Sequence, residues 1–163
     1  MLPFIFIAIA AMTLVGAIGV VTARNLFHAA LFLVLSFFGV AGIFITLEAE
    51  FLGVAQVLIY VGAISILIIF AIMLSRGIAR TAGAVLNAQW AVVAIGAMLL
   101  FALLVVLLLQ INWPVVQAAA PPDAIAELGR AFVDEYVIPF EIASVLLVVA
   151  LIGAIIIARE RES

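Results

Sequence analysis

The sequence predicts an all-α membrane protein with five spanning helices. Hydrophobic residues fill 71% of its 163 positions and charged residues only 9%. A soluble domain has about 45–50% apolar and about 25% charged residues, so this chain has more apolar surface than one small core can bury. Five apolar segments reach the roughly 20 residues that a helix needs to cross a bilayer: Leu2–Val21, Leu26–Leu47, Phe51–Leu74, Trp90–Ile111 and Tyr136–Ala158.

The links between these segments differ in length. TARN and EAE, the first two, allow only tight helical hairpins. The third covers residues 75–89, and the fourth, over residues 112–137, is predicted as a loop with a short surface helix after Pro122. Because no basic residues precede the apolar run MLPFIFIAIA, we interpret it as a retained first span. Without a repeat or a break in composition, we expect a single transmembrane helical domain over residues 1–163.

The placement of the arginines predicts the orientation, because cytoplasmic loops carry an excess of Lys and Arg. If the C-terminus is cytoplasmic, Arg130 alone among the six arginines lies outside. The opposite topology reverses this five-to-one bias. We therefore expect an outer N-terminus and an inner C-terminus in a bacterial cytoplasmic membrane. The arginines predicted to face the cytoplasm are Arg24, Arg76, Arg80, Arg159 and Arg161.

Several functions are excluded by composition. The chain has no cysteine, so it offers no thiolate for a metal or an iron–sulfur cluster, and a single His28 cannot provide a bis-histidine haem site. It has no basic patch for nucleic acid, no glycine-rich nucleotide loop, no nucleophile motif and no acidic or histidine cluster at metal spacing. We expect no catalytic, cofactor-binding or metal-binding residue in this chain alone.

The third span, FLGVAQVLIYVGAISILIIFAIML, carries polar and small residues near its middle. At 100° per residue, Gln56 and Tyr60 share one stripe, while Gly62 and Ser65 fall on nearly the opposite face. Such a helix is expected to be surrounded by other helices rather than by lipid. Two interpretations of the Gln56 and Tyr60 pair remain open: ordinary hydrogen bonding between helices, or a functional polar site.

Gly62 weakens the centre of this span. A glycine in a helix costs about 1 kcal/mol relative to alanine. It also tolerates irregular turns, including the single-turn π-bulges that are common at functional sites. The sequence therefore identifies Gly62 as a position where a bulge costs little.

Glu141 is the one acidic residue inside a predicted span. Pro139 fits the first turn of this helix, so Glu141 lies about one turn into it, near the predicted outer interface. One interpretation is an acid stabilised by the positive end of the helix dipole. The other is a carboxylate on a proton path or at a partner contact, because intramembrane ionisable groups are often functional.

Two stretches, RNLFHAALFLVLSFFGVAGIFITLEAEFLGVAQVLIYVGAISILIIFAIML and FEIASVLLVVALIGAIIIARE, resemble a known family. The family is subunit J of the proton-translocating NADH:quinone oxidoreductase, respiratory complex I, which corresponds to mitochondrial NADH dehydrogenase subunit 6. The resemblance covers residues 24–74 and 140–160. Its distinctive part is EAEFLGVAQVLIYVGAI, which combines an acidic turn, a Gln, a Tyr and a Gly in fixed order.

The resemblance implies roles for the unusual residues of the third span. It implies a π-bulge over Tyr60, Val61, Gly62 and Ala63 that converts to regular helix and rotates the half of the span beyond it. Tyr60 and Phe70 would then change neighbours, and Gln56 and Ser65 would bind partner helices or water. Some family members carry an acidic residue just after the third span, whereas this chain has Ser75, Arg76 and Gly77 there.

The resemblance also implies the function. This chain would be a non-catalytic membrane-arm subunit that couples quinone reduction to proton translocation, beside the quinone-site subunit, the small three-helix subunits and the antiporter-like subunits. NADH, FMN, iron–sulfur clusters and quinone would all bind those partners. One alternative is the equivalent subunit of a related ferredoxin-driven complex, membrane-bound hydrogenase or multisubunit cation/proton antiporter. Another, ranked lower, is an independent small transporter or scaffold.

Overall fold

The computed structural model describes residues 2–75, 89–111 and 123–159. All regular structure in these ranges is helical, and five helices are long and apolar enough to span a membrane. The predicted all-α fold with five spans is therefore confirmed. The orientation stays a prediction. The remaining residues on which sequence predictions rest lie outside the described ranges: Arg76, Gly77, Arg80, Pro122 and Arg161.

The helices fall into two compact units, one within residues 1–117 and one within residues 118–163. The first unit holds four spans and the second holds one span preceded by a short helix. In chain order the elements are α1 (Leu2–Thr22), α2 (Leu26–Thr46), α3 (Glu50–Ala55), the π-helix η1 (Gln56–Ile64), α4 (Ser65–Leu74), α5 (Trp90–Gln110), α6 (Ala124–Val133) and α7 (Val137–Ala158). Together α3, η1 and α4 form the third span.

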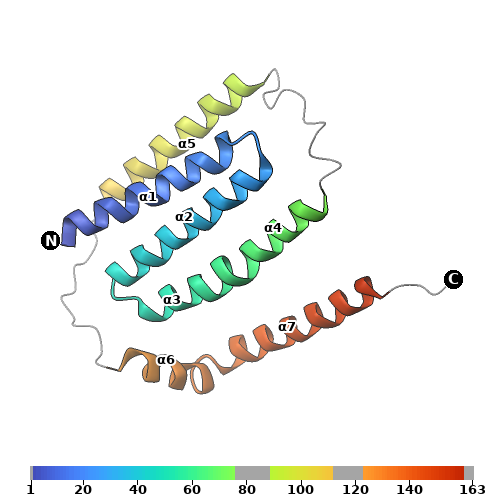
Figure 1. Cartoon of the computed structure of the whole chain (residues 1–163). Coiled ribbons are helices and arrows are strands. Elements are labelled where there is room, and N and C mark those ends of the chain that lie inside the picture. Colours follow the sequence, from blue (N-terminus) through green and yellow to red (C-terminus); the bar gives the residue numbers. More distant parts are fainter. Residues whose placement is uncertain (1, 76–88, 112–122, 160–163) are drawn as a thin grey trace. The chain divides into compact units, whose positions relative to one another are not determined.

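Three spans lie side by side in the first unit, with α2 between α1 and the third span (Figure 1). Both connections are short, so neighbouring spans run in opposite directions. Asn25 ends the first connection and caps α2, because its side-chain Oδ1 accepts a hydrogen bond from the Phe27 N–H at 2.9 Å. This bond satisfies one of the N–H groups that a helix start leaves unpaired.

A seam of small residues joins α1 to α2. A Cβ added at Gly16 would lie 2.8 Å from the Ser36 backbone nitrogen, and one added at Gly39 would meet the Thr13 side chain. The Ser36 hydroxyl donates a hydrogen bond to the Thr13 carbonyl oxygen at 3.2 Å. Lipid supplies no hydrophobic drive between helices, so close backbone approach and a hydrogen bond of about 0.6–1.7 kcal/mol hold such a seam together.

The turn between α2 and the third span is a Schellman motif with an unusual residue at its centre. The Glu48 N–H donates to the Ile45 carbonyl at 3.1 Å, and the Ala49 N–H donates to the Phe44 carbonyl at 2.9 Å. Glu48 has φ 59°, in the left-handed region where glycine is usual. For a non-glycine residue that conformation costs about 1–2 kcal/mol.

Replacing Glu48 with glycine is therefore expected to stabilise this hairpin by up to about 1 kcal/mol, whereas valine, which is β-branched, should destabilise it. Glu50→Gly is the matched control: Glu50 lies in the first turn of α3, where glycine should weaken the helix. The measurement is the temperature at which the purified assembly releases this subunit. Equal behaviour of Glu48→Gly and Glu50→Gly would contradict the strain at Glu48.

Neither α5 nor α7 has a buried residue in this chain. Apart from a few polar residues near their ends, such as Glu141 and Ser144 in α7, their side chains are apolar around the whole helix. A helix that is apolar on all sides must be covered by lipid or by other protein. The surfaces of α5 and α7 are thus available for the bilayer or for neighbouring subunits.

Candidate functional site in the third span

The third span changes its helical geometry at its centre. It begins as an ordinary α-helix, continues as a π-helix over the nine residues Gln56–Ile64, and returns to α-helix at Ser65. A π-helix pairs residues five apart instead of four, and it is rare, appearing mostly as single-turn bulges at functional sites. Nine consecutive π-helical residues are therefore an unusual feature in a membrane span.

Tyr60 and Ser65 close the far end of this π-helix. The Ser65 backbone N–H donates to the Tyr60 carbonyl oxygen, and the Ser65 hydroxyl donates to the same oxygen at 2.7 Å. Both bonds join residues five apart, so both belong to the π-helical register. Ser65 is only 2% exposed, so water does not compete strongly for its hydroxyl. One buried side chain thus reinforces the last π-helical turn.

The π-helix also changes which residues face α2. The buried residues of the third span are Gly53, Gln56 and Ser65, and α2 contacts all three segments of the span. The prediction that Ser65 lies nearly opposite Gln56 rests on 100° per residue. The wider π-helical turns advance by a smaller angle per residue, which brings the two residues closer to one face. Both polar residues are buried.

Gly62 lies inside η1, but the structure does not require glycine there for its dihedral angles. No glycine among the described residues has a positive φ. A Cβ added at Gly62 would lie 3.4 Å from the Val57 carbonyl oxygen, an ordinary contact, with no other atom of the described chain beyond its own helix nearby. Gly62 therefore leaves an open spot on the span, and any effect of a side chain there must come from the helix itself or from a neighbouring subunit.

The Tyr60 ring packs against α2. Its centroid lies 5.3 Å from that of Phe37, with the two rings edge to face at 72°. Aromatic pairs in this arrangement contribute about 0.5–1.5 kcal/mol beyond the area that they bury. This contact anchors the middle of η1 to α2 while the rest of the Tyr60 side chain stays exposed.

Tyr60→Ala is expected to destabilise the subunit by about 0.5–1.5 kcal/mol, because it removes the edge-to-face contact with Phe37. Tyr60→Phe retains the ring and should stay close to the unchanged protein. Thermal inactivation of the assembled protein measures both variants. An equal loss in the two variants would assign the effect to the hydroxyl group instead of the ring contact.

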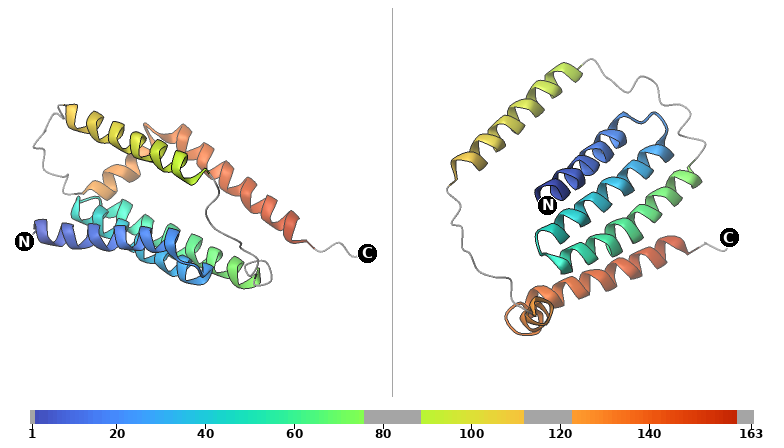
Figure 2. Two further views of the ribbon diagram at one scale, coloured as in Figure 1. Left: turned by 90° about the horizontal axis from the view of Figure 1, so that it is seen from above. Right: turned by 60° about the vertical axis from the view of Figure 1, so that its left-hand side comes forward.

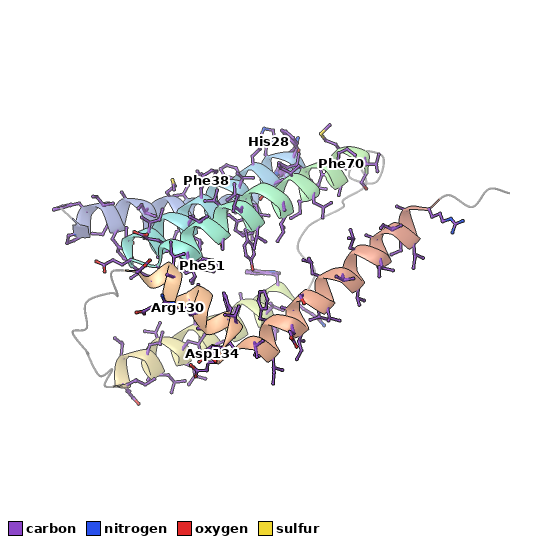
Figure 3. The ribbon with its side chains drawn as sticks, turned by 90° about the horizontal axis from the view of Figure 1, so that it is seen from below. His28, Phe38, Phe51, Phe70, Arg130 and Asp134 are labelled. Atoms are coloured by element: carbon purple, nitrogen blue, oxygen red, sulfur yellow. The ribbon has the colours of Figure 1, made fainter. Side chains whose placement is uncertain are left out.

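The other predicted residues of the span lie on its surface. Val61 is partly buried, Ala63 is exposed and Phe70, on α4, is 62% exposed. Figure 3 shows Phe70 near the end of α4 and His28 near the start of α2, at the same end of the unit. The Phe70 side chain is thus available to a partner subunit.

Glu141 lies in the second turn of α7, in the second compact unit. Its side chain is exposed, and its backbone carbonyl accepts a hydrogen bond from the Ser144 hydroxyl at 2.8 Å. Its role stays a prediction.

Sequence reasoning missed the small-residue seam between α1 and α2. Its signal was present in the sequence as two runs with three-residue spacing: Thr13, Gly16 and Gly19 in α1, and Ser36, Gly39 and Gly42 in α2. Residues three apart lie on one helix face. The seam packs α1 against the same helix, α2, that η1 contacts.

Comparison with known proteins identifies the family. The family model for NADH-ubiquinone/plastoquinone oxidoreductase chain 6 matches residues 16–157. The chain belongs to this family. The NAD(P)H-quinone oxidoreductase chain 6 of Leptolyngbya boryana is 40% identical over 157 residues, covering 94% of this chain and 78% of that protein. Its counterpart in Synechocystis sp. is 39% identical over 159 residues, covering 94% and 79%.

A relative named after a different complex is also similar to this chain. The F(420)H(2) dehydrogenase subunit J of Methanosarcina mazei is 36% identical over 159 residues, covering 95% of this chain and 89% of that protein. The resemblance to subunit J and subunit 6 is thus confirmed over most of the chain. With five spanning helices and this family membership, the protein is a multi-pass membrane protein of the chain 6 family.

Proposed function

We propose that this chain is a non-catalytic membrane-arm subunit of a proton-translocating quinone oxidoreductase. Its third span would couple quinone reduction on a neighbouring subunit to proton movement through others. The observation that carries the proposal is the nine-residue π-helix at the centre of that span, in a chain of the chain 6 family. A π-helix costs stability relative to an α-helix, so its presence at a buried contact favours a functional role.

The names of the relatives support a role that does not involve the electron donor. Chains of similar sequence are named after complexes that oxidise different donors, NAD(P)H and F(420)H(2). A subunit shared by such complexes serves a step that they have in common. Charge movement across the membrane fits that description better than donor oxidation. The flavin, the iron–sulfur clusters and the donor would bind other subunits, since this chain offers no cysteine ligand.

The geometry supplies a physical basis for coupling. In a regular α-helix, Gln56 and Ser65 would lie on opposite faces, because nine residues advance by about 900°, or two and a half turns. In the structure both residues are buried, and α2 is in contact with both η1 and α4. Conversion of η1 to α-helix would therefore turn α4 relative to α3 and withdraw one of the two residues from α2. Such an element has two discrete arrangements that events elsewhere in a complex can bias.

The rotation would change the contacts of this span with partner subunits. Phe70 and the exposed part of Tyr60 would move against neighbouring helices, and Gln56 or Ser65 would gain or lose contact with water or with a partner. We place this span between the quinone-site subunit and the antiporter-like subunits, next to the small three-helix subunits. In a bacterium the assembly would lie in the cytoplasmic membrane with the C-terminus inside.

Purification through an affinity tag on this chain tests the proposal. The expected result is co-elution with a large assembly that reduces quinone and is inhibited by rotenone or piericidin. Assay with NADH, F(420)H(2) and reduced ferredoxin then identifies the donor, and the F(420)H(2) dehydrogenase relative makes a donor other than NADH the second candidate. A stable homo-oligomer without quinone reductase activity would contradict the proposal and favour an independent transporter or scaffold.

A further inference from the structure

The short helix α6, with the first turn of α7, forms a second distinctive feature of the chain. Residues 123–135 carry four acidic side chains and one basic one, and they precede the last membrane span directly. Three of these charges, Glu127, Arg130 and Asp134, are three and four residues apart. Glu127 and Arg130 lie on one face of α6, and Asp134 directly follows its last residue. Figure 3 labels Arg130 on α6 and Asp134 just after it.

The opposite face of α6 is apolar. Ile125, Leu128 and Phe132 have the same three- and four-residue spacing, displaced by two residues from the charged set. Ile125 is 58% exposed and Leu128 and Phe132 are half-buried, so Ile125 is the member of this face that the described chain leaves most open. A helix with separate apolar and charged faces at a membrane border is typical of one that lies in the interface plane.

Contacts across the turn fix α6 at the level of the first turn of α7. The Phe132 ring stacks on that of Phe140, with centroids 5.9 Å apart and planes at 24°. The Tyr136 N–H donates to the Ala131 carbonyl oxygen at 2.7 Å and closes the turn. The 22 residues of α7 extend for about 33 Å, close to the roughly 30 Å hydrocarbon thickness. Its first turn, and α6 with it, therefore lies at the boundary between acyl chains and head groups.

The direction of α6 agrees with this depth. In the right-hand view of Figure 2, α6 is seen nearly end-on while α7 runs across the picture, so the two helices meet at a steep angle. When α7 crosses the bilayer, α6 therefore extends along the membrane surface and does not enter the bilayer as a further span. Its ten residues are also too few to cross.

We propose that α6 is an interfacial anchor whose Ile125, Leu128 face is immersed in the acyl-chain boundary of the bilayer. The occupant of this face is phospholipid. The apolar face supplies the attraction, because the acidic charged face provides none for anionic head groups, so contact with zwitterionic lipid is expected. The anchor fixes the depth and direction at which α7 enters the membrane. This proposal does not depend on the electron donor or on a switch in the third span.

Site-specific photo-crosslinking tests the anchor. A diazirine amino acid is placed at Ile125 or, as the matched control on the charged face, at Glu127, in the full chain within its assembly. The assembly is reconstituted in vesicles of phosphatidylethanolamine with alkyne-bearing acyl chains. We expect at least about fivefold more lipid adduct at position 125 than at position 127. Equal adducts at both positions, or an adduct of position 125 with another subunit, would overturn the proposal.

Thiol labelling in native membranes gives a second measurement, which requires only the replacement of one side chain by cysteine. Since the chain has no cysteine of its own, a mobility shift of this chain after reaction with an impermeant polyethylene-glycol maleimide reports only the introduced thiol. Glu127→Cys is expected to react, and Ile125→Cys to react at least about fivefold more slowly until detergent is added. Equal rates before detergent would show that the face is in water and would contradict the anchor.

Discussion

Gly16→Leu is expected to reduce the amount of this subunit in the assembled complex by at least about tenfold. A Cβ at position 16 would lie 2.8 Å from the Ser36 nitrogen and 3.0 Å from the Phe32 carbonyl oxygen. Both are backbone atoms of α2, so no side-chain rotation makes room. The two helices must therefore separate. The overpacking costs about 1–3 kcal/mol, and the separation also breaks the hydrogen bond between Ser36 and Thr13. Each 1.4 kcal/mol is a factor of ten.

Quantitative immunoblotting of membranes and of the purified assembly measures this loss. Gly96→Leu in α5 is the control, since a Cβ there meets no atom of the described chain within 4 Å. Gly16→Ala should give an intermediate loss, because it adds the clashing atom without the rest of a leucine side chain. Normal accumulation of Gly16→Leu would show that α1 and α2 do not pack along the Gly16 and Gly39 seam.

Gly62→Leu is expected to lower the number of protons translocated per quinone reduced at least several-fold, with the subunit still assembled. The physical reason is that glycine populates a wider range of backbone angles than leucine, so its removal raises the cost of interconverting the π-helical and α-helical registers. A side chain at position 62 also fills an open spot that partner helices would occupy. Within this chain, the variant should leave the contact between η1 and α2 in place.

Proteoliposomes containing the purified assembly allow both halves of the reaction to be followed, with quinone reduction measured by absorbance and proton uptake by a fluorescent dye. Gly153→Leu in α7 serves as the control glycine, since a Cβ there also meets no atom within 4 Å in the described residues beyond its own helix backbone. If Gly62→Leu kept an unchanged proton-to-quinone ratio in a fully assembled complex, the proposed switching role of the third span would be wrong.

Ser65→Ala tests the same element through its hydrogen bond. It removes the hydroxyl that reinforces the π-helical turn at the Tyr60 carbonyl, a hydrogen bond whose net contribution is about 0.5–1.5 kcal/mol. We expect it to shift the balance toward the α-helical register and to lower the proton-to-quinone ratio. Ser144→Ala removes a bond of the same kind, from Ser144 to the Glu141 carbonyl in α7, and should leave the ratio unchanged. Equal effects of the two variants would contradict a specific role for Ser65.

Much of the architecture could be predicted from composition and spacing alone. Apolar runs of about 20 residues require helices in a bilayer, because an unpaired backbone group in lipid costs several kcal/mol. The spans therefore began and ended close to the predicted residues, and α6 lies in the link where a short surface helix was expected. The unusual residues of the third span could be recognised for the same reason, because an amide, a phenol and a glycine are unfavourable in an otherwise apolar membrane helix.

The faces of the third span depended on tertiary structure. Hydrophobic periodicity assumes one helical pitch, and at that pitch Gln56 and Ser65 lie on opposite sides. The free-energy difference between α-helical and π-helical hydrogen bonding is small, so contacts with neighbouring groups decide between them. In this span those contacts include the ring contact of Tyr60 with Phe37 and the burial of Ser65. Likewise, the small or polar residues Thr13, Gly16, Ser36 and Gly39 have regular spacing in the sequence. Only the antiparallel alignment of α1 with α2 brings them together in one seam. The length of an apolar run is a local property of the chain. The hydrogen-bonding register of a helix and the face that it buries depend on contacts between segments distant in sequence.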